Sequence, residues 1–376
     1  MIKQVEMFQG LNVTYNITED CNLKCAYCYE VDKKPVDLPL DYAKRFNRIL
    51  LDDPNPIGAT DEQDWIIHSG IILDFIGGDA LMRPKLVEQI IRDFIFQAGS
   101  AGHRWARRWR SSISTNGTLF GEPGVKEFLN EFKENISLGV SVDGCPEIHN
   151  KNRSNSMSAI LKHWDWYMNY TPNPSTKATL NRDSIPFLLK SLKFLHEDLG
   201  LKYINMNFIF EDMELSTLDL EELDKQMVAC VEYVKKHDND IYWSMLSPLF
   251  GDACSMKDPE KGWCGAGSMP CLSVNGKIYP CFRFMPHTMH DRAFDLPVGD
   301  VWNGFDKKEN FLLVRQQTRD KISNKECLEC PIETCCSWCI GSSFSETGKF
   351  HRQTNICEVH KIQAKHAKEY QDGGNT

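Results

Sequence analysis

Short apolar stretches alternate with helical patterns along the first two thirds of the chain. The helical pattern is clearest at 185–199, where apolar residues recur on one face, with Ser184 as the predicted N-cap and Gly200 as the predicted end. Such alternation predicts an α/β fold with a parallel sheet and right-handed crossovers. The predicted strands lie at 11–17, 71–76, 109–113, 136–142, 175–180 and 203–210.

Length and charge narrow the class of protein. A chain of 376 residues with 41% hydrophobic content predicts one large domain and a smaller one. No basic start precedes an apolar run, and no stretch has the length to span a bilayer, so we expect a soluble, cytoplasmic protein without a membrane partner. A formal charge of -9 argues against a nucleic-acid partner. The basic run at 103–110 either connects a helix to a strand or grips a phosphate or acidic peptide.

Three cysteines follow the first predicted strand in the segment CNLKCAYC. Thiolates at Cys21, Cys25 and Cys28 can hold three irons of a [4Fe-4S] cluster and leave the fourth iron without a protein ligand. The alternatives are a zinc loop or unrelated buried thiols, but structural zinc sites need four ligands and no second CxxC pair lies nearby. Fifteen cysteines without a signal peptide favour metal or redox chemistry over disulfides.

Further motifs follow the next predicted strands in order. They are Gly77-Gly78-Asp79, the TNGT segment at 115–118 and the SVDGCPEIHNKNR segment at 141–153. Their NG and DG dipeptides also close tight turns, which is the structural alternative. Together with CxxxCxxC, the ordered set resembles the radical S-adenosylmethionine (SAM) family, whose fold is a partial (βα)6 TIM barrel. Active sites of barrels gather at the carboxyl ends of the strands.

The resemblance implies roles for individual residues. The first three cysteines would hold a [4Fe-4S] cluster, Tyr27 occupies the aromatic position of the motif, and Asp79 stands where the family has Glu. A guanidinium suits a carboxylate because its fork can pair with both oxygens. By resemblance, the SAM-binding residues would be Tyr27, Gly77, Gly78, Asp79, Ser112, Ser141 (ribose) and Arg153 (carboxylate).

The cysteine-rich tail resembles the SPASM extension, which commonly carries two further [4Fe-4S] clusters. By resemblance, one would be held by Cys264, Cys271, Cys281 and Cys339, and the other by Cys327, Cys330, Cys336 and Cys357. The spacing is one residue shorter than in the family, so Cys335 is an alternative to Cys336. A double zinc module is the rival interpretation of the tail. The expected domains are a barrel at 1–240 and a SPASM domain with little regular structure at 241–376.

Several features fall outside these motifs. Of the remaining cysteines, Cys230 and Cys254 are expected to be core thiols. Cys145 follows a turn at the carboxyl end of a strand, so we hypothesise that it faces the substrate and donates a hydrogen atom. The segment at 52–70 looks like a surface insertion that forms a lid or a loop.

The family resemblance also implies a reaction. SAM would be split into methionine and a 5'-deoxyadenosyl radical that abstracts hydrogen from a ribosomally made precursor peptide (RiPP), forming an oxidative modification such as a thioether or carbon-carbon crosslink. The alternative is an anaerobic sulfatase-maturing enzyme that makes formylglycine from Cys or Ser, but those enzymes have Asp where this chain has Phe282. An external one-electron reductant such as flavodoxin or ferredoxin is expected.

Two further expectations concern partners and class. No room precedes residue 11 for a leader-binding domain, so we expect a leader peptide to dock on the barrel, the tail or another protein. A non-enzymatic electron carrier or metal store would need the cysteines but not the SAM-pocket motifs.

Overall fold

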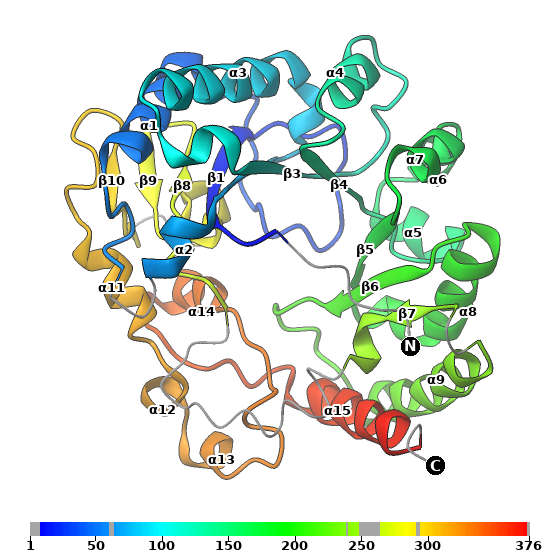
Figure 1. The fold of residues 1–376 in the computed structure, drawn as a ribbon. Coiled ribbons are helices and arrows are strands. Elements are labelled where there is room, and N and C mark those ends of the chain that lie inside the picture. The colour runs from blue at the N-terminus through cyan, green and yellow to red at the C-terminus, as the bar shows by residue number, and fades with distance from the viewer. Residues whose placement is uncertain (1–7, 60–63, 238–239, 248–263, 291–293, 374–376) are drawn as a thin grey trace.

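The computed structural model describes residues 8–59, 64–237, 240–247, 264–290 and 294–373. Its strands form one open sheet in the order β10-β9-β8-β1-β2-β3-β4-β5-β6-β7 (Figure 1). Neighbouring strands from β1 to β7 are parallel. The six predicted strands are present, and the predicted fold class is confirmed. These strands are β1 (Leu11–Thr18), β2 (Ile71–Gly77), β3 (Trp109–Thr115), β4 (Ile136–Val140), β5 (Ser175–Leu180), β6 (Tyr203–Phe208) and the short β7 (Tyr242–Trp243).

Helices cover the outer face of this sheet. Tyr15 of β1 shows the contact, because its ring lies 5.2 Å from the ring of Phe46 and its hydroxyl donates to Asn47 Oδ1 at 2.6 Å. Side chains alternate along a strand, so Asn12 and Asn16 point to the inner face, here called the lumen. The helices of the barrel are α1 (Leu40–Asp52), α2 (Asp64–Ser69), α3 (Pro84–Ser100), α4 (Val125–Glu131), α5 (Pro146–Asn152), α6 (Met157–Leu161), α7 (Trp164–Tyr170), α8 (Leu188–Lys193) and α9 (Thr217–Lys236).

The helix after β5 differs from the prediction at its start. It begins as a 3-10 turn, η4 (Arg182–Phe187), continues as α8 and ends in a π turn, η5 (Phe194–Asp198). The N-cap is Asn181 and not Ser184, which lies three residues later and completes a capping box with Asn181. Pro186 within η4 lacks an N–H donor, which fits the tighter first turn. Gly200 follows the end of this helix, as predicted, and has a φ of +70°.

The tail continues the barrel sheet at the β1 edge. β8 (Cys271–Leu272) pairs in parallel with β1, while β9 (Lys277–Tyr279) and β10 (Gly299–Asp300) add antiparallel strands. The tail helices are α11 (Glu309–Arg315), α12 (Arg319–Ile322), α13 (Lys325–Leu328), α14 (Ile340–Thr347) and α15 (Cys357–Asp372). At the other edge α15 packs on α9, where His366 Nε2 lies 2.8 Å from Asp224 Oδ1. The tail therefore contacts both edges of the barrel.

The segment at 52–70 is fastened to the tail. Arg315 donates to Ile57 O and Gly58 O at 2.7 Å, and Lys308 donates to Asn55 O at 2.7 Å. None of its described residues lines the two cavities discussed below. The described part of the segment, which includes α2, is therefore docked on the tail, and it does not support the lid hypothesis.

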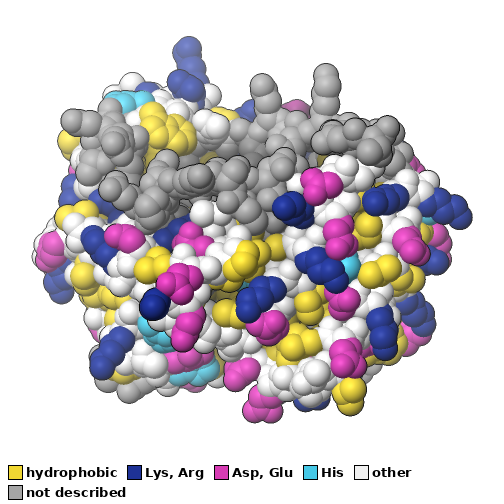
Figure 2. All heavy atoms as spheres, turned by 90° about the horizontal axis from the view of Figure 1, so that it is seen from below, with side chains coloured by type: hydrophobic (Ala, Val, Ile, Leu, Met, Phe, Trp, Pro, Cys, Tyr) yellow, Lys and Arg dark blue, Asp and Glu magenta, His cyan; other side chains and the backbone are white. Residues whose placement is uncertain are grey.

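Surface charge is mixed. In the basic run, Trp105 and Trp109 are buried and the arginines are exposed, so the run connects η3 (Arg104–Arg107) to β3. Figure 2 shows Lys and Arg side chains interspersed with Asp and Glu on the face seen from below. Among the described residues, no helix has the length and apolar character to cross a membrane.

Candidate active site

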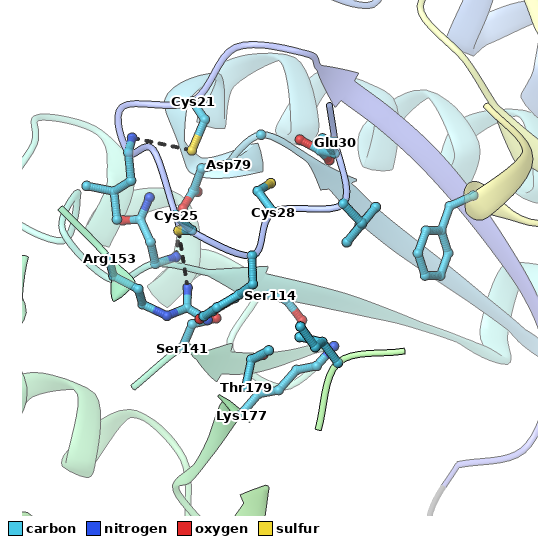
Figure 3. Close-up of a pocket in the computed structure, with 18 of the residues that line it drawn as sticks. Cys21, Cys25, Cys28, Glu30, Asp79, Ser114, Ser141, Arg153, Lys177 and Thr179 are labelled. Atoms are coloured by element: carbon cyan, nitrogen blue, oxygen red, sulfur yellow. Dashed lines mark hydrogen bonds between the residues drawn. The ribbon is translucent and has the colours of Figure 1, made fainter. Parts of the chain in front are cut away.

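The loop from β1 to α1 carries the first three cysteines. Cys21, Cys25 and Cys28 line one cavity of about 290 Å³ at the carboxyl ends of the barrel strands (Figure 3). Burial raises the pKa of Cys21 to about 11. It also raises the pKa of Cys25, where the nearby Arg153 guanidinium opposes the shift. The structure thus brings the predicted cluster ligands to one wall, as the spacing indicates.

Backbone contacts hold this loop across the mouth of the barrel. Ala26 N–H donates to Asn152 O at 2.9 Å, and Lys24 N–H donates to Ser154 Oγ at 2.9 Å. Both acceptors lie at the end of α5, directly before and after Arg153. The position of the cysteine loop is therefore tied to the position of Arg153.

Gly77 and Gly78 allow the end of β2 to meet the same loop. Gly77 has a φ of +134°, and a Cβ there would lie 2.1 Å from Thr18 O. A Cβ on Gly78 would lie 1.9 Å from Asp20 O and 2.7 Å from Cys21 Cβ. No side chain fits at such distances. The two glycines, expected to approach a ligand, also admit the backbone of the cysteine loop.

Asp79 lies at the cavity with its carboxylate engaged by the protein. It is 2% exposed and accepts hydrogen bonds from Leu81 N at 3.0 Å, Thr115 Oγ1 at 2.9 Å and Asn116 N at 2.8 Å. Burial raises the pKa of Asp79, and these hydrogen bonds oppose the rise. The carboxylate therefore joins the ends of β2 and β3 in addition to lining the cavity.

Asp143, which follows β4, holds two residues of the cavity wall, Arg153 and Tyr27. It is fully buried and accepts from Arg153 Nε at 2.9 Å, from the Tyr27 hydroxyl and from Thr179 N at 3.1 Å. The Asp143 N–H donates to His149 Nδ1 at 3.2 Å. Burial lowers the pKa of His149 to about 4, so the ring is neutral and Nδ1 can accept. Asp143 thus fixes Arg153 and Tyr27 together, a role that the sequence motif does not reveal.

The remaining predicted SAM contacts lie at different depths. Arg153 Nη1 is 4.0 Å from Cys25 Sγ, so the outer part of the guanidinium faces the cysteine loop. Ser141 and Ser114 line the cavity (Figure 3). Ser112 does not line it, because it lies one inward-facing position deeper on β3, where it is paired with Asp74 of β2. Ser114 therefore occupies the wall position predicted for Ser112.

Cys145 does not face the cavity, which contradicts its predicted role. It is fully buried, lines neither cavity, and its thiol accepts from Ser191 Oγ at 3.6 Å. Gly144, with a φ of +135°, turns the chain toward α8, where a Cβ on this glycine would lie 2.1 Å from Ser191 Oγ. Burial raises the pKa of Cys145. Cys230 is also buried, in the main core, and Cys254 lies outside the described residues.

The inner thiol group of the tail consists of Cys264, Cys271, Cys281 and Cys339. Burial raises the pKa of Cys281, and the nearby Cys264 and Cys339 thiolates raise it further. Burial and the charge on Cys281 also raise the pKa of Cys271. Cys339 also lines the cavity that holds the cysteine loop. The structure therefore assembles the first predicted set of auxiliary ligands beside the site.

The outer thiol group consists of Cys327, Cys330, Cys336 and Cys357. Burial raises the pKa of Cys357 to about 11, with further contributions from the other three thiolates. Cys336 Sγ lies 3.4 Å from His360 Nδ1, and the nearby Arg352 opposes the rise that burial causes in the pKa of Cys336. Cys335 is disulfide-bonded. The structure thus groups Cys336 with the predicted ligands and engages Cys335 elsewhere.

The spacing of these thiols bears on the metal. Among the described residues, no three Cys, His, Asp or Glu side chains converge closely enough to bind a single metal ion. A zinc ion needs its thiolates within about 4 Å of one another, because each Zn–S bond is about 2.3 Å. A cubane binds each thiolate to a different iron, so its ligands lie further apart. Four thiols in each tail group are a donor set that suits an iron-sulfur cluster and also suits zinc, so the identity of the metal stays a prediction.

Sequence reasoning missed a buried charge cluster at the ends of the cysteine loop. His287 lies between two carboxylates, with Nδ1 3.4 Å from Glu19 Oε1 and Nε2 3.7 Å from Glu30 Oε1. Lys33 Nζ lies 3.7 Å from Glu30 Oε2. Burial lowers the pKa of Lys33, but the nearby Cys28 and Cys21 thiolates outweigh that effect and raise it overall. No local pattern links a histidine of the tail to this loop.

Comparisons with known proteins place this arrangement in a family. No protein-family model matches the chain. It is 32% identical over 350 residues to Fe-coproporphyrin III synthase of Methanosarcina barkeri, covering 85% of this chain and 80% of that protein. It is 23% identical over 368 residues to the antilisterial bacteriocin subtilosin biosynthesis protein AlbA of Bacillus subtilis, covering 92% and 70%. The structure of anSMEcpe with bound AdoMet and the Cp18Cys peptide superposes with a TM-score of 0.74 at 16% identity, covering 97% and 99%. The chain belongs to the radical SAM enzymes with a SPASM extension.

The identification confirms two predictions. This radical SAM enzyme has the predicted fold, and it belongs to the predicted enzyme class. Its family uses SAM, also called AdoMet, together with iron-sulfur chemistry. The residue roles are proposals that the geometry above supports.

Replacing Gly78 with Ala should disturb the first cysteine loop of this radical SAM enzyme. The added Cβ would overlap Asp20 O, so the backbone of Cys21 must shift. We expect purified Gly78→Ala enzyme to lose about four irons per chain, one cubane, together with 5'-deoxyadenosine formation. Iron analysis and mass spectrometry check this. Gly99→Ala is the matched control, because a Cβ there meets nothing within 4 Å. Full iron and normal deoxyadenosine in Gly78→Ala would contradict the prediction.

Replacing Cys145 with Ala should leave catalysis nearly unchanged. The thiol is enclosed against Ser191 and lines neither cavity. We expect the rate of 5'-deoxyadenosine formation to stay within about twofold of wild type and the stability to fall by about 1 kcal/mol. Single-turnover mass spectrometry and thermal unfolding measure the two effects. A loss of product formation with deoxyadenosine retained would restore the hydrogen-donor role.

Proposed function

We propose that this radical SAM enzyme is a peptide maturase that forms an oxidative modification, such as a thioether or carbon-carbon crosslink, in a ribosomally made peptide. The observation that carries the proposal is the shared cavity, whose wall combines the cysteine loop, Arg153 and Cys339 of the inner thiol group. In this proposal, a site for radical generation lies beside a site for electron removal. The relative AlbA, which acts in bacteriocin biosynthesis, supports a peptide substrate.

The donor sets fit the cofactors of the family. Cys21, Cys25 and Cys28 would hold the first [4Fe-4S] cluster, and Arg153 would pair with the SAM carboxylate. When bound and reduced, this cofactor pair supplies the 5'-deoxyadenosyl radical. The protein orients the groups around it: Asp143 fixes Arg153 at Nε, which leaves the outer guanidinium nitrogens for the ligand.

The inner and outer thiol groups would hold two auxiliary [4Fe-4S] clusters in a SPASM domain at 241–376. Each group supplies four thiols, which is a closed ligand set. The Arg352 guanidinium opposes the rise that burial causes in the pKa of Cys336, and His360 Nδ1 lies 3.4 Å from the Cys336 thiol. Such contacts stabilise thiolate charge and tune cluster potential. Closed auxiliary clusters favour a role in electron transfer, with a flavodoxin or ferredoxin as the external reductant and the cytoplasm as the location.

A second cavity offers the route for the peptide. It encloses about 370 Å³ and shares Tyr27, Cys28 and Glu211 with the first cavity. Its further lining includes residues of the loops after β5 and β6, such as Asn181 and Met213. Loops at the carboxyl ends of barrel strands commonly bind substrate. A peptide lying here would present one residue to the radical site while the loops exclude water.

The sulfatase-maturing alternative lacks its expected base. The residue after Cys281 is Phe282, which lines the cavity with its ring 5.7 Å from that of Tyr29. An aromatic ring cannot accept a proton from a Cys or Ser substrate. The neighbouring Arg283 is bound to Glu211 at 2.6 Å and also cannot act as a base. This position favours crosslinking over formylglycine formation.

A tetrapyrrole-modifying function is the second candidate, favoured by the 32% identity to Fe-coproporphyrin III synthase over most of both chains. Coproporphyrin is a planar macrocycle with four carboxylates. The two candidates require different chemistry at the substrate cavity, and direct binding experiments separate them.

The test begins with anaerobic reconstitution with iron and sulfide, followed by mass spectrometry after addition of SAM and a strong reductant. We expect 5'-deoxyadenosine and about eleven to twelve irons per chain. Incubation with candidate precursor peptides should then yield a product lighter by about two hydrogens per crosslink. Conversion of a tetrapyrrole without any conversion of peptides would replace the proposal with the second candidate.

A further inference from the structure

The lumen of the barrel is polar and incompletely satisfied. On β1, Asn12 Oδ1, Thr14 Oγ1 and both amide atoms of Asn16 are buried without a hydrogen-bond partner among the described residues. These alternate positions face away from the helix-covered side, where Tyr15 packs. Buried polar groups in proteins normally have partners. The lumen is therefore suited to a polar ligand group.

Lys177 of β5 lines the cavity at the carboxyl ends of the barrel strands (Figure 3). The Lys177 side chain is exposed, yet the surrounding protein lowers the pKa of Lys177, an effect that Asp74 opposes. Within the described part of the chain, the ammonium group makes no hydrogen bond and no ion pair within 4 Å. Among the described residues, Lys177 is thus a cation on the cavity wall without a direct partner.

The other cations on the cavity wall are paired. Arg153 Nε lies 2.9 Å from Asp143, and Arg283 Nη2 lies 2.6 Å from Glu211. Lys33 lies 3.7 Å from Glu30. Asp79, the remaining wall carboxylate, is engaged by backbone and hydroxyl donors. The described wall therefore leaves one positive charge, at Lys177, for an incoming anion.

We propose that Lys177 binds a carboxylate of the substrate inside the lumen and selects substrates that carry one near the reacting carbon. Ammonium-carboxylate hydrogen bonds are stronger in a partly desolvated site than in water. Asp74 on β2 faces the same space and would repel the carboxylate when ionised. This inference rests on the proposed function, because it takes the lumen to be the substrate site. The carboxylate could belong to a peptide or to a tetrapyrrole.

The test uses the reconstituted enzyme with ¹³C-methylated lysines, recorded first without SAM and then loaded with SAM before the probes are added. The Lys177 signal is identified by its absence in the Lys177→Arg variant. N-acetylglutamate N-methylamide is the peptide-like probe, its glutamine counterpart is the neutral control, and coproporphyrin III is the tetrapyrrole probe. We expect at least one acid to shift the Lys177 signal, while the neutral control does not and the exposed Lys202 signal stays in place.

Affinity measurements on variants sharpen the test. Lys177→Met should weaken binding of the effective acid by about tenfold or more, because a charge-assisted hydrogen bond is lost. Asp74→Asn should strengthen binding about threefold or more, because a repelling charge is removed. Equal affinity in wild type and Lys177→Met would overturn the proposal, even if the variant folds and cleaves SAM normally.

The outcomes separate this inference from the proposed function. A Lys177 shift with the glutamate probe supports both. A shift with coproporphyrin III alone supports the carboxylate subsite and overturns the peptide maturase. No shift with either acid overturns the subsite while leaving the maturase to be judged by peptide conversion. A shift caused by SAM alone, with no further response to the acids, assigns Lys177 to the cofactor and also overturns the subsite.

Discussion

Replacing Cys28 with Ala should abolish 5'-deoxyadenosine formation, a loss of at least about a thousandfold. Two thiolates, Cys21 and Cys25, would remain in the loop, and a cubane held by two protein ligands is poorly retained. The inner and outer thiol groups lie in the tail and keep their eight cysteines. We therefore expect about eight irons per chain in the reconstituted variant, against about twelve in wild type. Iron analysis and mass spectrometry of the SAM products measure both quantities.

Cys145→Ala is the matched control for this experiment, since it removes a cysteine that lines neither cavity. It should retain all the iron and the full rate. Deoxyadenosine formation by Cys28→Ala at the wild-type rate would refute the assignment of the first cluster. An electron carrier, the non-enzymatic hypothesis, would show no SAM cleavage in either protein.

The barrel strands were predictable because their signal is local. A parallel strand packed between helices and lumen gives a short β-rich run, and 175–180 was predicted to the residue. The start of the helix after β5 could not be predicted in the same way, because Asn181 competes with Ser184 for the cap and Pro186 changes the first turn. Choosing between adjacent caps depends on tertiary contacts that lie outside the sequence window.

The path of the tail could not be predicted. Two residues of β8 pair with β1, and Arg315 fastens the segment at 52–70 to α11. Such contacts join residues far apart in the chain, and each depends on the geometry of the whole sheet. Composition and spacing indicate that the tail is rich in cysteine, but they do not indicate which barrel edge it extends.

The site, like the fold, has parts that the sequence predicts and parts that it does not. Spacing predicts the first cysteine set, and the resemblance to the SPASM extension implies the two sets of the tail. In the structure, the thiols within each tail set lie near enough to influence one another's pKa. The direction of a single side chain has no such signal. Cys145 turns toward Ser191. Lys177, which belongs to no sequence motif, lines the cavity. Whether a strand residue faces lumen or helix follows from alternation, but only once the register is known.

The second large effect is expected at Asp143, which acts on the site through Arg153 and Tyr27. Its carboxylate accepts from Arg153, Tyr27 and Thr179, and it is fully buried. Asp143→Ala leaves the buried Arg153 cation without its carboxylate, which typically costs about 3–5 kcal/mol. We expect a clearly lower midpoint of thermal unfolding and a loss of SAM affinity of about tenfold or more, because Arg153 is no longer held.

Two variants distinguish this role from a general effect of removing a carboxylate. Asp183→Ala breaks an exposed ion pair with Lys151 and should change stability by less than about 1 kcal/mol. Asp143→Asn keeps an oxygen acceptor for Thr179 N–H but removes the charge that pairs with Arg153. Its midpoint of thermal unfolding and its SAM affinity should therefore lie between those of wild type and Asp143→Ala. If Asp143→Ala unfolds at the wild-type temperature and binds SAM with wild-type affinity, Arg153 is positioned by its other neighbours, and the cysteine loop does not depend on this carboxylate.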